Sequence, residues 1–531
     1  MSERNGQPEG NLAELPPGWC WATVGELGEV RLGRQRSPKN RSEQHPTKYI
    51  RAANITWAGL DLSDVLDMEF KPAELGAYRL LPGDVLLSEA SGSPGEVGKP
   101  AIWRGEIEDC CFQNTVIRFR PKAMPPEFPF VVFCHFARNG IFSRAGKGVG
   151  IHHLSADRFT SLAIPLAPLN EQRRIVEKID ELLSDLDAGV AALQRIKANL
   201  KRYRASVLKA AVEGRLTEQW RAKHSKTEPT TKLLERILAE RRKKWEEDQL
   251  AKFATAEKEP PKNWQKKYVE PAAPDTSKLH ELPKGWCWAT VEQVTQFAKY
   301  GSSAKTSIDG AGVPVLRMGN IQDGSLDLTD LKYLPQDHDE FPDLLLREGD
   351  LLFNRTNSAE LVGKSAIYHG NPSPCSYASY LIALRAVCGC TPELLCYYLN
   401  SWCGRAWIAS VVCQQVGQAN VNGTKLQALV FPLPPEPEQT QIIAEVERCF
   451  SNVAVAQAQV DANLKRAARL RQCILKQAFD GRLVPQDPTD EPADKLLERI
   501  RLERTPANGT VTPSGKPAKT RRAKATAKVP E

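Results

Sequence analysis

A long internal repeat restricts the fold of this chain more than any other feature of its sequence. The peptide GWCWATV occupies residues 18–24 and recurs unchanged at residues 285–291, an offset of 267 positions. Two further pairs of segments align on the same offset: IPLAPLNEQRRIV from Ile164 with FPLPPEPEQTQII from Phe431, and YRASVLKAAVEGRL from Tyr203 with LRQCILKQAFDGRL from Leu470. Because 531 residues exceed what one hydrophobic core usually serves, we expect two copies of one module, each with its own core.

The two copies share a framework but differ in their loops. The shared positions are Arg51 and Arg317, Asn54 and Asn320, Asp84 and Asp350, and the Gly-Lys pairs at residues 98–99 and 363–364. In contrast, the segment RLGRQRSPKNR from Arg31 aligns with the unlike segment AKYGSSAKTS from Ala298. The segment SEASGSPGE from Ser88 likewise aligns with NRTNSAE from Asn354. A repeated scaffold with unlike loops favours two sites of the same kind and different specificity.

The centre of each copy carries strand signals. Short apolar runs such as DVLLS from Asp84, TVIRF from Thr115 and YLIAL from Tyr380 alternate with Gly, Pro, Asn and Asp. We therefore expect an α+β (mixed) fold with two strand-rich globular domains of about 150 residues each.

Each strand-rich region is followed by a long helical pattern. Residues 179, 182, 186, 189, 193, 196, 200, 203, 207 and 210 alternate steps of three and four, and all are apolar or aromatic except Gly189. We expect a helix from about Asn170, as N-cap, to Glu213, with Gly214 as C-cap, and a second one from Glu438 to Asp480 before Gly481. At 1.5 Å per residue, about 43 residues give a rod of roughly 65 Å. Packing against its own domain is the alternative for one such helix, whereas two of equal length favour an antiparallel coiled coil between them.

The resulting domain prediction has six parts. They are a first domain at 1–165, a first long helix at 166–216, a charged linker with a helix from Lys232 at 217–280, a second domain at 281–431, a second long helix at 432–486, and a short helix with a disordered basic tail at 487–531.

Composition narrows the class of protein. The 72 Lys and Arg exceed the 64 Asp and Glu by 8, a mild excess that is compatible with a polyanion partner. The polar start of the chain and the absence of long apolar runs indicate a soluble, cytoplasmic protein without a membrane span. The thirteen cysteines lack CxxC spacing, so we expect reduced thiols and no metal site.

The sequence offers no recognisable catalytic centre. None of the Pro-Pro pairs at 16, 125, 260 and 434 has the flanking residues of an adenine methyltransferase motif, and SGSPGEVGK lacks the first glycine of a phosphate-binding loop. His152 and His153 have Ala419 and Asn420 in their places in the second copy. The carboxylate pair Asp61 and Asp64, repeated as Asp327 and Asp330, is more typical of turns than of an acid and base pair.

These motifs together resemble the specificity subunit of a type I restriction-modification enzyme over nearly the whole chain. LPPGWCWATV and LPKGWCWATV open the two halves, the two NEQ- and PEQ-containing segments begin the long helices, and LKAAVEGRLTEQWR and LKQAFDGRLVPQD end them. The resemblance implies a non-catalytic chain with two target-recognition domains, each reading one half of a bipartite, asymmetric site in double-stranded DNA, and with the helix pair as a spacer of pseudo-two-fold symmetry. It also implies two modification (methyltransferase) subunits and restriction/translocase subunits as partners. The chain itself would bind no cofactor, and S-adenosylmethionine, ATP and magnesium would belong to those partners.

Candidate DNA-contacting residues lie mainly in the loops that differ, because Arg, Lys, Asn and Gln recognise base edges and phosphates. In the first copy they are Arg34, Gln35, Arg36, Lys39, Ser91, Lys147 and His152; in the second they are Lys299, Ser302, Lys305, Asn354, Arg355, Asn357, Gln415 and Gln418. The shared residues Arg51, Arg317, Lys99 and Lys364 are candidates for phosphate contacts or for holding the scaffold. Exposed solubilising charge is the alternative for each candidate.

Two other functions remain open at this point. One is a structural interaction protein whose purpose is the coiled coil, and the other is a stand-alone DNA-modifying enzyme with unfamiliar motifs.

Overall fold

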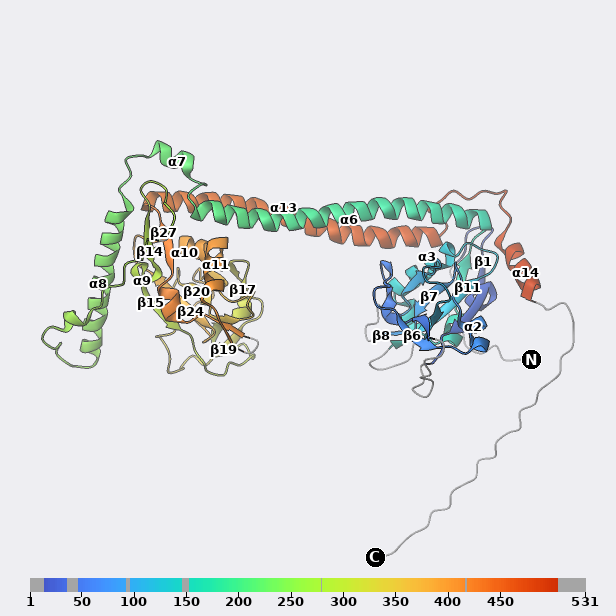
Figure 1. Cartoon of the computed structure of the whole chain (residues 1–531), viewed down its shortest axis with the longest axis horizontal. Helices are drawn as coiled ribbons and strands as arrows, with labels where there is room; N and C mark the ends of the chain where they lie inside the picture. The colour runs from blue at the N-terminus through green and yellow to red at the C-terminus, as the bar shows by residue number, and fades with distance from the viewer. Residues whose placement is uncertain are drawn as a thin grey trace, which may run out of the picture. The chain divides into compact units, whose positions relative to one another are not determined.

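The computed structural model describes residues 14–35, 46–91, 96–145, 152–277, 279–415 and 418–504. The chain divides into two compact units, residues 1–191 with 464–531 (unit 1) and residues 192–463 (unit 2). Two helices, α6 (Leu169–Val212) and α13 (Glu436–Phe479), each contribute one part to each unit (Figure 1). Each unit therefore contains one globular domain and one stretch of paired long helix.

The globular domain of unit 1 is built around a four-stranded antiparallel sheet with the strand order β2-β11-β7-β9, beside a three-stranded sheet β10-β3-β6. Val85 and Leu87 belong to one core cluster and Leu86 belongs to another, since successive side chains of a strand point to opposite faces. The strands are β1 (Cys20–Thr23), β2 (Gly28–Leu32), β3 (Pro46–Ile50), β4 (Ile55–Thr56), β5 (Gly59–Leu60), β6 (Leu66–Glu69), β7 (Val85–Ser88), β8 (Ala90–Ser91), β9 (Pro100–Ile102), β10 (Cys111–Phe112), β11 (Val116–Pro121), β12 (His152–His153) and β13 (Ala163–Leu166). The helices are α1 (Val24–Leu27), η2 (Ala52–Asn54), α2 (Pro72–Tyr78), α3 (Glu127–Arg138), α4 (Ile141–Ala145), α5 (Ala156–Ser161) and α14 (Ala493–Arg504).

The globular domain of unit 2 repeats this topology. Its sheets have the orders β15-β24-β20-β22 and β19-β16-β23. The strands are β14 (Cys287–Thr290), β15 (Thr295–Tyr300), β16 (Val313–Leu316), β17 (Ile321–Gln322), β18 (Ser325–Leu326), β19 (Lys332–Leu334), β20 (Leu351–Asn354), β21 (Thr356–Asn357), β22 (Ser365–Ile367), β23 (Ser376–Tyr377), β24 (Leu381–Ala386), β25 (Cys413–Gln415), β26 (Gln418–Asn420) and β27 (Val430–Leu433). The helices are α7 (Glu218–Lys223), α8 (Thr230–Thr255), η4 (Trp264–Lys267), α9 (Val291–Val294), η5 (Met318–Asn320), α10 (Pro392–Asn400), α11 (Trp402–Val411) and α12 (Gly423–Gln427). The expected α+β class and the expected strands at DVLLS, TVIRF and YLIAL are confirmed.

The repeated peptide GWCWATV forms the same local structure twice. The strand β1 pairs antiparallel with β13, with Ala22 opposite Ile164, and β14 pairs with β27, with Ala289 opposite Phe431. A capping box then turns the chain into a short helix, closed by Thr23 with Glu26 in one copy and by Thr290 with Gln293 in the other. The peptide is thus a structural entry to each domain.

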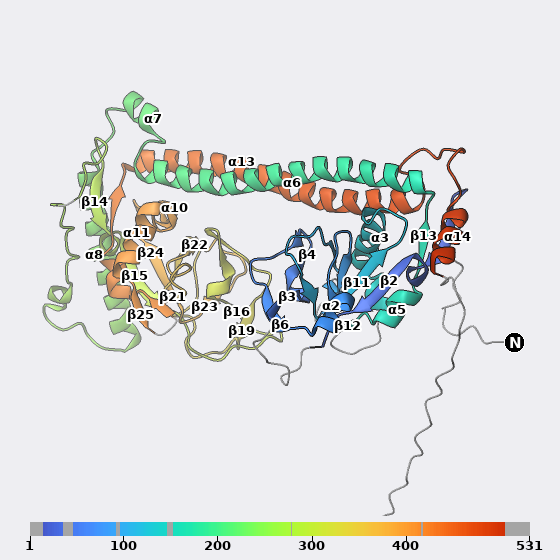
Figure 2. The same ribbon diagram turned by 45° about the vertical axis from the view of Figure 1, so that its right-hand side comes forward.

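The two long helices pack together, and the views of Figures 1 and 2 both show them side by side. In unit 1 an Arg471 guanidinium nitrogen is paired with Asp187, and in unit 2 the Lys197 Nζ lies 2.8 Å from an Asp461 oxygen. Early residues of α6 thus face late residues of α13, and the reverse, which is the antiparallel arrangement. Ile179 and Val207 of the expected seam are buried, whereas Tyr203 stays half-exposed because a single partner helix covers only one side of it.

The expected helix ends are partly correct. Both helices end before a glycine in the left-handed conformation, since Gly214 has φ +69° and Gly481 has φ +65°. At the other end, the prediction that Asn170 is the N-cap of α6 is wrong. The helix begins at Leu169, and Asn170 lies in its first turn, where its Nδ2 donates to an Asp490 oxygen at 3.2 Å. Pro168 stands directly before the helix, and its carbonyl accepts the N–H of Gln172 at 2.9 Å, which is the first bond of the helical pattern.

A shared helical sequence covers each domain. KLLERI occurs in α8 and in α14, and in α8 Leu233 and Ile237 are buried in the core of unit 2. In α14 the corresponding Leu496 and Ile500 are buried in the core of unit 1. The backbone N–H of Ala493 also donates to the Gly18 carbonyl at 2.8 Å. Residues near the end of the chain therefore complete the domain near its start.

Candidate nucleic-acid interface

Several candidates of the second copy line one cavity of about 590 Å³ in unit 2. Ser302 comes from the loop after β15, Arg317 from the start of η5, Asn357 from β21, and Lys364 from the turn before β22. A second cavity of about 300 Å³ shares Asn357 with the first and adds Gln418 from β26. Loops that are distant in the sequence thus meet at one place.

Two strand pairings bring further candidates together. In unit 1, β8 pairs with β12, so that Ser91 lies opposite His152. In unit 2, β26 pairs with both β21 and β25, so that Gln415 lies opposite Gln418. Ser91, His152 and Gln415 are described only in their backbone, whereas the side chain of Gln418 is exposed.

Arg34 has a structural position. It is buried, its Nε lies 3.0 Å from a Glu74 oxygen, and its Nη1 donates to the Glu69 carbonyl at 2.6 Å. Its guanidinium also lies 5.2 Å from the centre of the Phe70 ring. Gln35 beside it is exposed, and the remaining first-copy candidates Arg36, Lys39 and Lys147 lie outside the described residues.

The shared Arg51 and Arg317 form the same network in both copies. The side-chain oxygen of Asn54 accepts the N–H of Arg51, and the Arg51 guanidinium pairs with Asp64. The same bonds recur in the second copy, where the Arg317 Nη2 lies 2.8 Å from an Asp330 oxygen. These arginines close the loop that follows β3 in unit 1 and β16 in unit 2.

The carboxylates beside this network act as turn residues. Hydrogen bonds from the Ser63 hydroxyl and N–H hold the pKa of Asp61 below its usual value, and bonds from the Thr329 N–H and hydroxyl do the same for Asp327. Both side chains accept bonds from the residue two positions later, which is an Asx-type turn. The turn interpretation therefore holds for Asp61 and Asp327, whereas Asp64 and Asp330 pair with Arg51 and Arg317.

The shared lysines differ in their surroundings. The Lys99 Nζ lies 2.5 Å from a Glu96 oxygen, and Glu96 also accepts the indole N–H of Trp57 at 3.0 Å. In the second copy Leu361 stands three residues before Lys364, where Glu96 stands before Lys99. Within the described ranges the Lys364 ammonium has no ion pair, so it is available to an anion.

The glycine before each lysine is required by packing. Gly98 has φ +74°, and a Cβ there would lie 2.2 Å from the Phe142 ring; Gly363 has φ +83°, and a Cβ there would lie 2.2 Å from Ile408. The Gly-Lys pair is thus a close contact between a turn and a helix, which explains it without a phosphate-binding loop.

The other second-copy candidates have varied positions. Lys305 is exposed, and the Lys299 Nζ donates to the Asp343 carbonyl at 2.9 Å. The Arg355 guanidinium lies over the Tyr300 ring at 4.8 Å. Asn354 is fully buried at the end of β20, where a ligand on the surface would not reach it.

Three residues that the sequence analysis did not nominate line the larger cavity with exposed apolar side chains. They are Met318, Leu361 and Tyr380. Residue type alone did not select them, since polar side chains were the expected readers. An alignment of the two copies would have selected them, because Ala52, Glu96 and Thr115 stand at the corresponding positions of the first copy.

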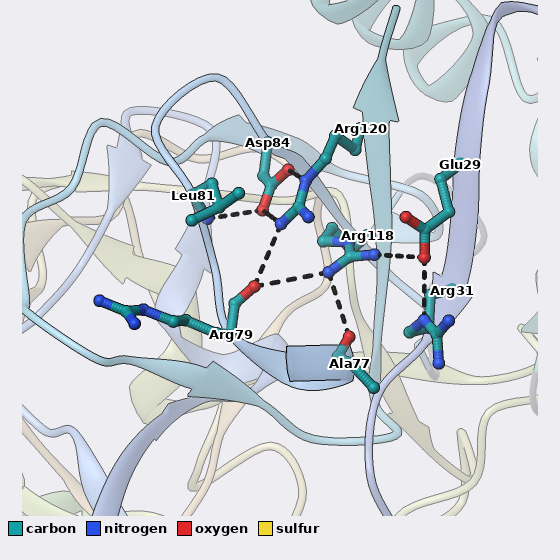
Figure 3. Close-up of polar contacts among 8 residues, drawn as sticks. All are labelled: Glu29, Arg31, Ala77, Arg79, Leu81, Asp84, Arg118 and Arg120. Atoms are coloured by element: carbon teal, nitrogen blue, oxygen red, sulfur yellow. Dashed lines mark hydrogen bonds and ion pairs between the residues drawn. The ribbon is translucent and has the colours of Figure 1, made fainter. Parts of the chain in front are cut away.

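An ion-pair network with Asp84 and Arg118 buried supports the central sheet of unit 1 (Figure 3). Asp84 accepts two bonds from the Arg120 guanidinium at 2.6 and 2.7 Å, and it also accepts the N–H of Leu81. Arg118 is 1% exposed and its Nη2 lies 2.7 Å from a Glu29 oxygen; burial lowers the pKa of its guanidinium. Unit 2 keeps only the first pair, as Asp350 with Arg385. These charges hold the scaffold together.

Other kinds of site receive no support in the part of the chain that is described. No group of three His, Cys, Asp or Glu side chains is arranged to hold a metal ion there. All thirteen cysteines are unpaired, and burial raises the pKa of the adjacent Cys110 and Cys111 thiols to about 12. No described helix combines the length and apolar character needed to cross a membrane.

Comparison with known proteins gives a consistent result. Residues 16–202 match the family model described as the type I restriction modification DNA specificity domain. The chain is 28% identical over 522 residues to the type I restriction enzyme EcoKI specificity subunit of Escherichia coli K12, covering 94% of this chain and 98% of that relative. It is 26% identical to the StySPI specificity subunit of Salmonella potsdam, covering 94% and 99%. A chain from a solved structure concerned with assembly and conformational transition of the type I R-M system has a TM-score of 0.58 at 20% identity, covering 89% of this chain and all of that one, so the fold is similar.

Proposed function

The chain belongs to the family of type I restriction-modification specificity subunits, and from that premise we propose that it selects a bipartite DNA sequence on which partner subunits act. One observation carries the proposal: residues from loops that differ between the copies gather at one place on a framework that is the same in both. A shared framework with unlike loops suits two reading sites with unlike half-sites.

Each globular domain would contact one half-site. Lys364 supplies positive charge at the larger cavity of unit 2, where Arg317 lies with its guanidinium paired to Asp330. Asn357 and Gln418 supply amides that can pair with base edges. In unit 1, the β8–β12 pair with Ser91 and His152 takes the corresponding place, and Gln35 is exposed. Arg36, Lys39 and Lys147, which lie outside the described residues, are proposed as DNA contacts from the sequence alone. Lys299, Ser302, Lys305, Arg355 and Gln415 complete the proposed surface in unit 2, whereas Arg34, Arg51, Lys99 and Asn354 have mainly structural positions.

The long helices would set the distance between the half-sites. A helix of 44 residues at 1.5 Å per residue spans about 66 Å, which is enough to hold two readers one or more helical turns of DNA apart.

Catalysis would belong to partner subunits. In this proposal the chain is not an enzyme: it docks two modification subunits, which bring S-adenosylmethionine, and restriction subunits, which use ATP and magnesium, and it works in the cytoplasm. The thirteen free thiols are compatible with a reducing compartment such as the cytoplasm.

DNA binding by the purified full-length chain, followed at rising salt, tests the proposal. We expect affinity that falls with salt, because lysines and arginines displace counterions from phosphates, and we expect adenine methylation only after a modification subunit is added. Methyl transfer by the chain alone would contradict the proposal and support the stand-alone enzyme. A complex with modification subunits that prefers no DNA sequence would support the structural interaction protein.

A further inference from the structure

Three exposed apolar side chains surround the larger cavity of unit 2. Met318 is 40% exposed, Leu361 is 39% exposed and Tyr380 is 48% exposed, and all three line this cavity. Met318 and Tyr380 also line the smaller cavity beside it. Exposed apolar side chains gathered at one cavity indicate a ligand that presents an apolar surface there.

The matched positions of unit 1 carry no such side chains. Ala52 follows Arg51 as Met318 follows Arg317, and Glu96 precedes Lys99 as Leu361 precedes Lys364. Thr115 stands two residues before Ile117, whose place in the sheet corresponds to that of Ile382, two residues after Tyr380. At these three positions, exposed apolar side chains are therefore present in the second copy and not in the first.

The same exchange changes the charge at the cavity. In unit 1, a Glu96 carboxylate oxygen lies 2.5 Å from the Lys99 Nζ and forms an ion pair with it. In unit 2, the replacement of that acid by Leu361 leaves the Lys364 ammonium without an ion pair among the described residues. Arg317 lines the cavity as well, but its guanidinium is paired with Asp330, so the cation beside the apolar side chains is Lys364. This combination suits a polyanion that carries a small apolar group.

We infer that the domain of unit 2 reads a thymine in its half-site through the 5-methyl group, with Met318, Leu361 and Tyr380 as the apolar contact and Lys364 as its cationic neighbour. The inference rests on the proposed function. Among the four base pairs the thymine methyl is the one apolar group exposed in the major groove, and contact with apolar side chains is how proteins recognise it. The Asn357 amide at the same cavities can pair with an adjacent base edge.

Single replacement of each thymine by deoxyuridine tests the inference, because it removes only the methyl group. The full-length chain, assembled with its modification subunits, first selects its target from an unmethylated randomised duplex library. We expect one thymine in one half of that target whose replacement weakens binding about fourfold, as for the loss of one buried methyl group. In Met318→Ala and Leu361→Ala this penalty should disappear, whereas Leu328→Ala should keep it. Leu328 is also exposed in unit 2, and it lines neither cavity.

A second variant tests the cation. Leu361→Glu restores the acid of the first copy, so we expect it to engage Lys364, to weaken binding, and to reduce the slope of log affinity against log salt by about one. Thermal melting of each variant at the wild-type temperature shows that the fold is kept.

The failures are distinguishable. Sequence-selective binding without any thymine whose methyl matters, or a deoxyuridine penalty unchanged in both alanine variants, overturns the inference and leaves the proposed function standing. A methyl effect seen only when 5-methylcytosine is exchanged for cytosine also overturns it. A complex that selects no sequence overturns the proposed function itself.

Discussion

The indole Nε1 of Trp19 donates to a carboxylate oxygen of Glu171 at 3.0 Å, across 152 residues, and Trp286 makes the same bond to Glu438 at 2.9 Å across the same separation. Each bond joins the start of a globular domain to the first turn of the long helix that follows it. Both carboxylates are about 1% exposed. The tryptophan of the repeated GWCWATV peptide therefore fixes where each domain meets its helix.

The second carboxylate oxygen of each glutamate has different surroundings in the two copies. The Glu438 Oε1 accepts bonds from the Thr217 hydroxyl at 2.7 Å and from the Arg221 Nε at 3.2 Å, whereas the Glu171 Oε1 is buried without a partner in the described structure. We expect Glu438→Gln to destabilise unit 2 by about 1.5–3 kcal/mol, because one amide cannot accept from both sides. Glu171→Gln should cost less than about 1 kcal/mol. Urea denaturation followed by hydrogen exchange of peptides from β14 and β1 measures the two effects, and equal losses would contradict the account.

The burial of Glu171 predicts that the stability of unit 1 depends on pH. Burial raises the pKa of Glu171, to which Asp490 also contributes. The native state then keeps the proton to higher pH than the unfolded chain does, so the stabilisation is full below the ordinary glutamate pKa of about 4.3 and is lost as pH rises through the folded value. The stability of Glu171→Gln relative to wild type should therefore increase with pH above about 4.3. A difference that does not change between pH 4 and 7 would contradict this cause.

The ion pairs at the four-stranded sheets predict that removal of either arginine destabilises its own unit. Arg120→Ala and Arg385→Ala would leave Asp84 and Asp350, each about 1% exposed, without their guanidinium partners. We expect each to destabilise its unit by about 3–5 kcal/mol, because an uncompensated buried charge remains. Arg31→Ala, which removes an exposed partner of Glu29, should cost less than about 1 kcal/mol and is the control. Urea midpoints compare the three, and a similar small loss in all would argue against a structural role for the buried pairs.

The helix α14 predicts dependence between distant parts of the chain. Truncation after residue 492 removes Leu496, Leu497 and Ile500 from the core of unit 1, together with the ion pair between Arg501 and Glu26. Because a buried aliphatic side chain contributes about 1.5–3 kcal/mol, we expect unit 1 to lose several kcal/mol while unit 2 is unchanged. Hydrogen exchange of β1 and β14 reports the two units separately. Truncation after residue 504 keeps these contacts and serves as the control, and protection of β1 unchanged by the shorter chain would contradict the packing.

The helix pair predicts a spacer that can be lengthened. Insertion of one heptad in both α6 and α13, between the contacts of Asp187 with Arg471 and of Lys197 with Asp461, adds about 10 Å while the apolar seam is kept. We expect the unread spacer in the DNA target to grow by about three base pairs. Sequencing of methylated sites from the assembled complex measures it, and a spacer of unchanged length would mean that the helices do not set the distance.

Much of the fold could be predicted from the sequence because it is written twice. The apolar strands, the long helices and the glycines that end them follow local rules of periodicity and capping, and the repeat doubles each signal. Asn170 misled because a residue with capping preference stands one position inside the helix, which begins at Leu169 directly after Pro168.

The candidate site was less predictable, since burial is decided by distant partners. Arg34 and Asn354 look like polar loop residues, and yet Glu74, which stands 40 positions after Arg34, pairs with it, and the sheet buries Asn354. Among the described residues Lys364 has no ion pair, because Leu361 stands where Glu96 stands in the first copy. That exchange becomes meaningful only once the two lysines are known to lie in equivalent turns. Met318 and Tyr380 were overlooked because an apolar residue is expected in a core.

Exchange of the first domain tests the central claim most directly. Replacement of residues 14–166 by the corresponding domain of another specificity subunit keeps β1 paired with β13 and leaves Glu171 in place to receive the indole N–H. The target of the hybrid, assembled with its modification subunits, is then read from its methylated adenines. We expect one half of the target to change while the other half and the spacer stay the same. A change in both halves would contradict independent reading by two domains.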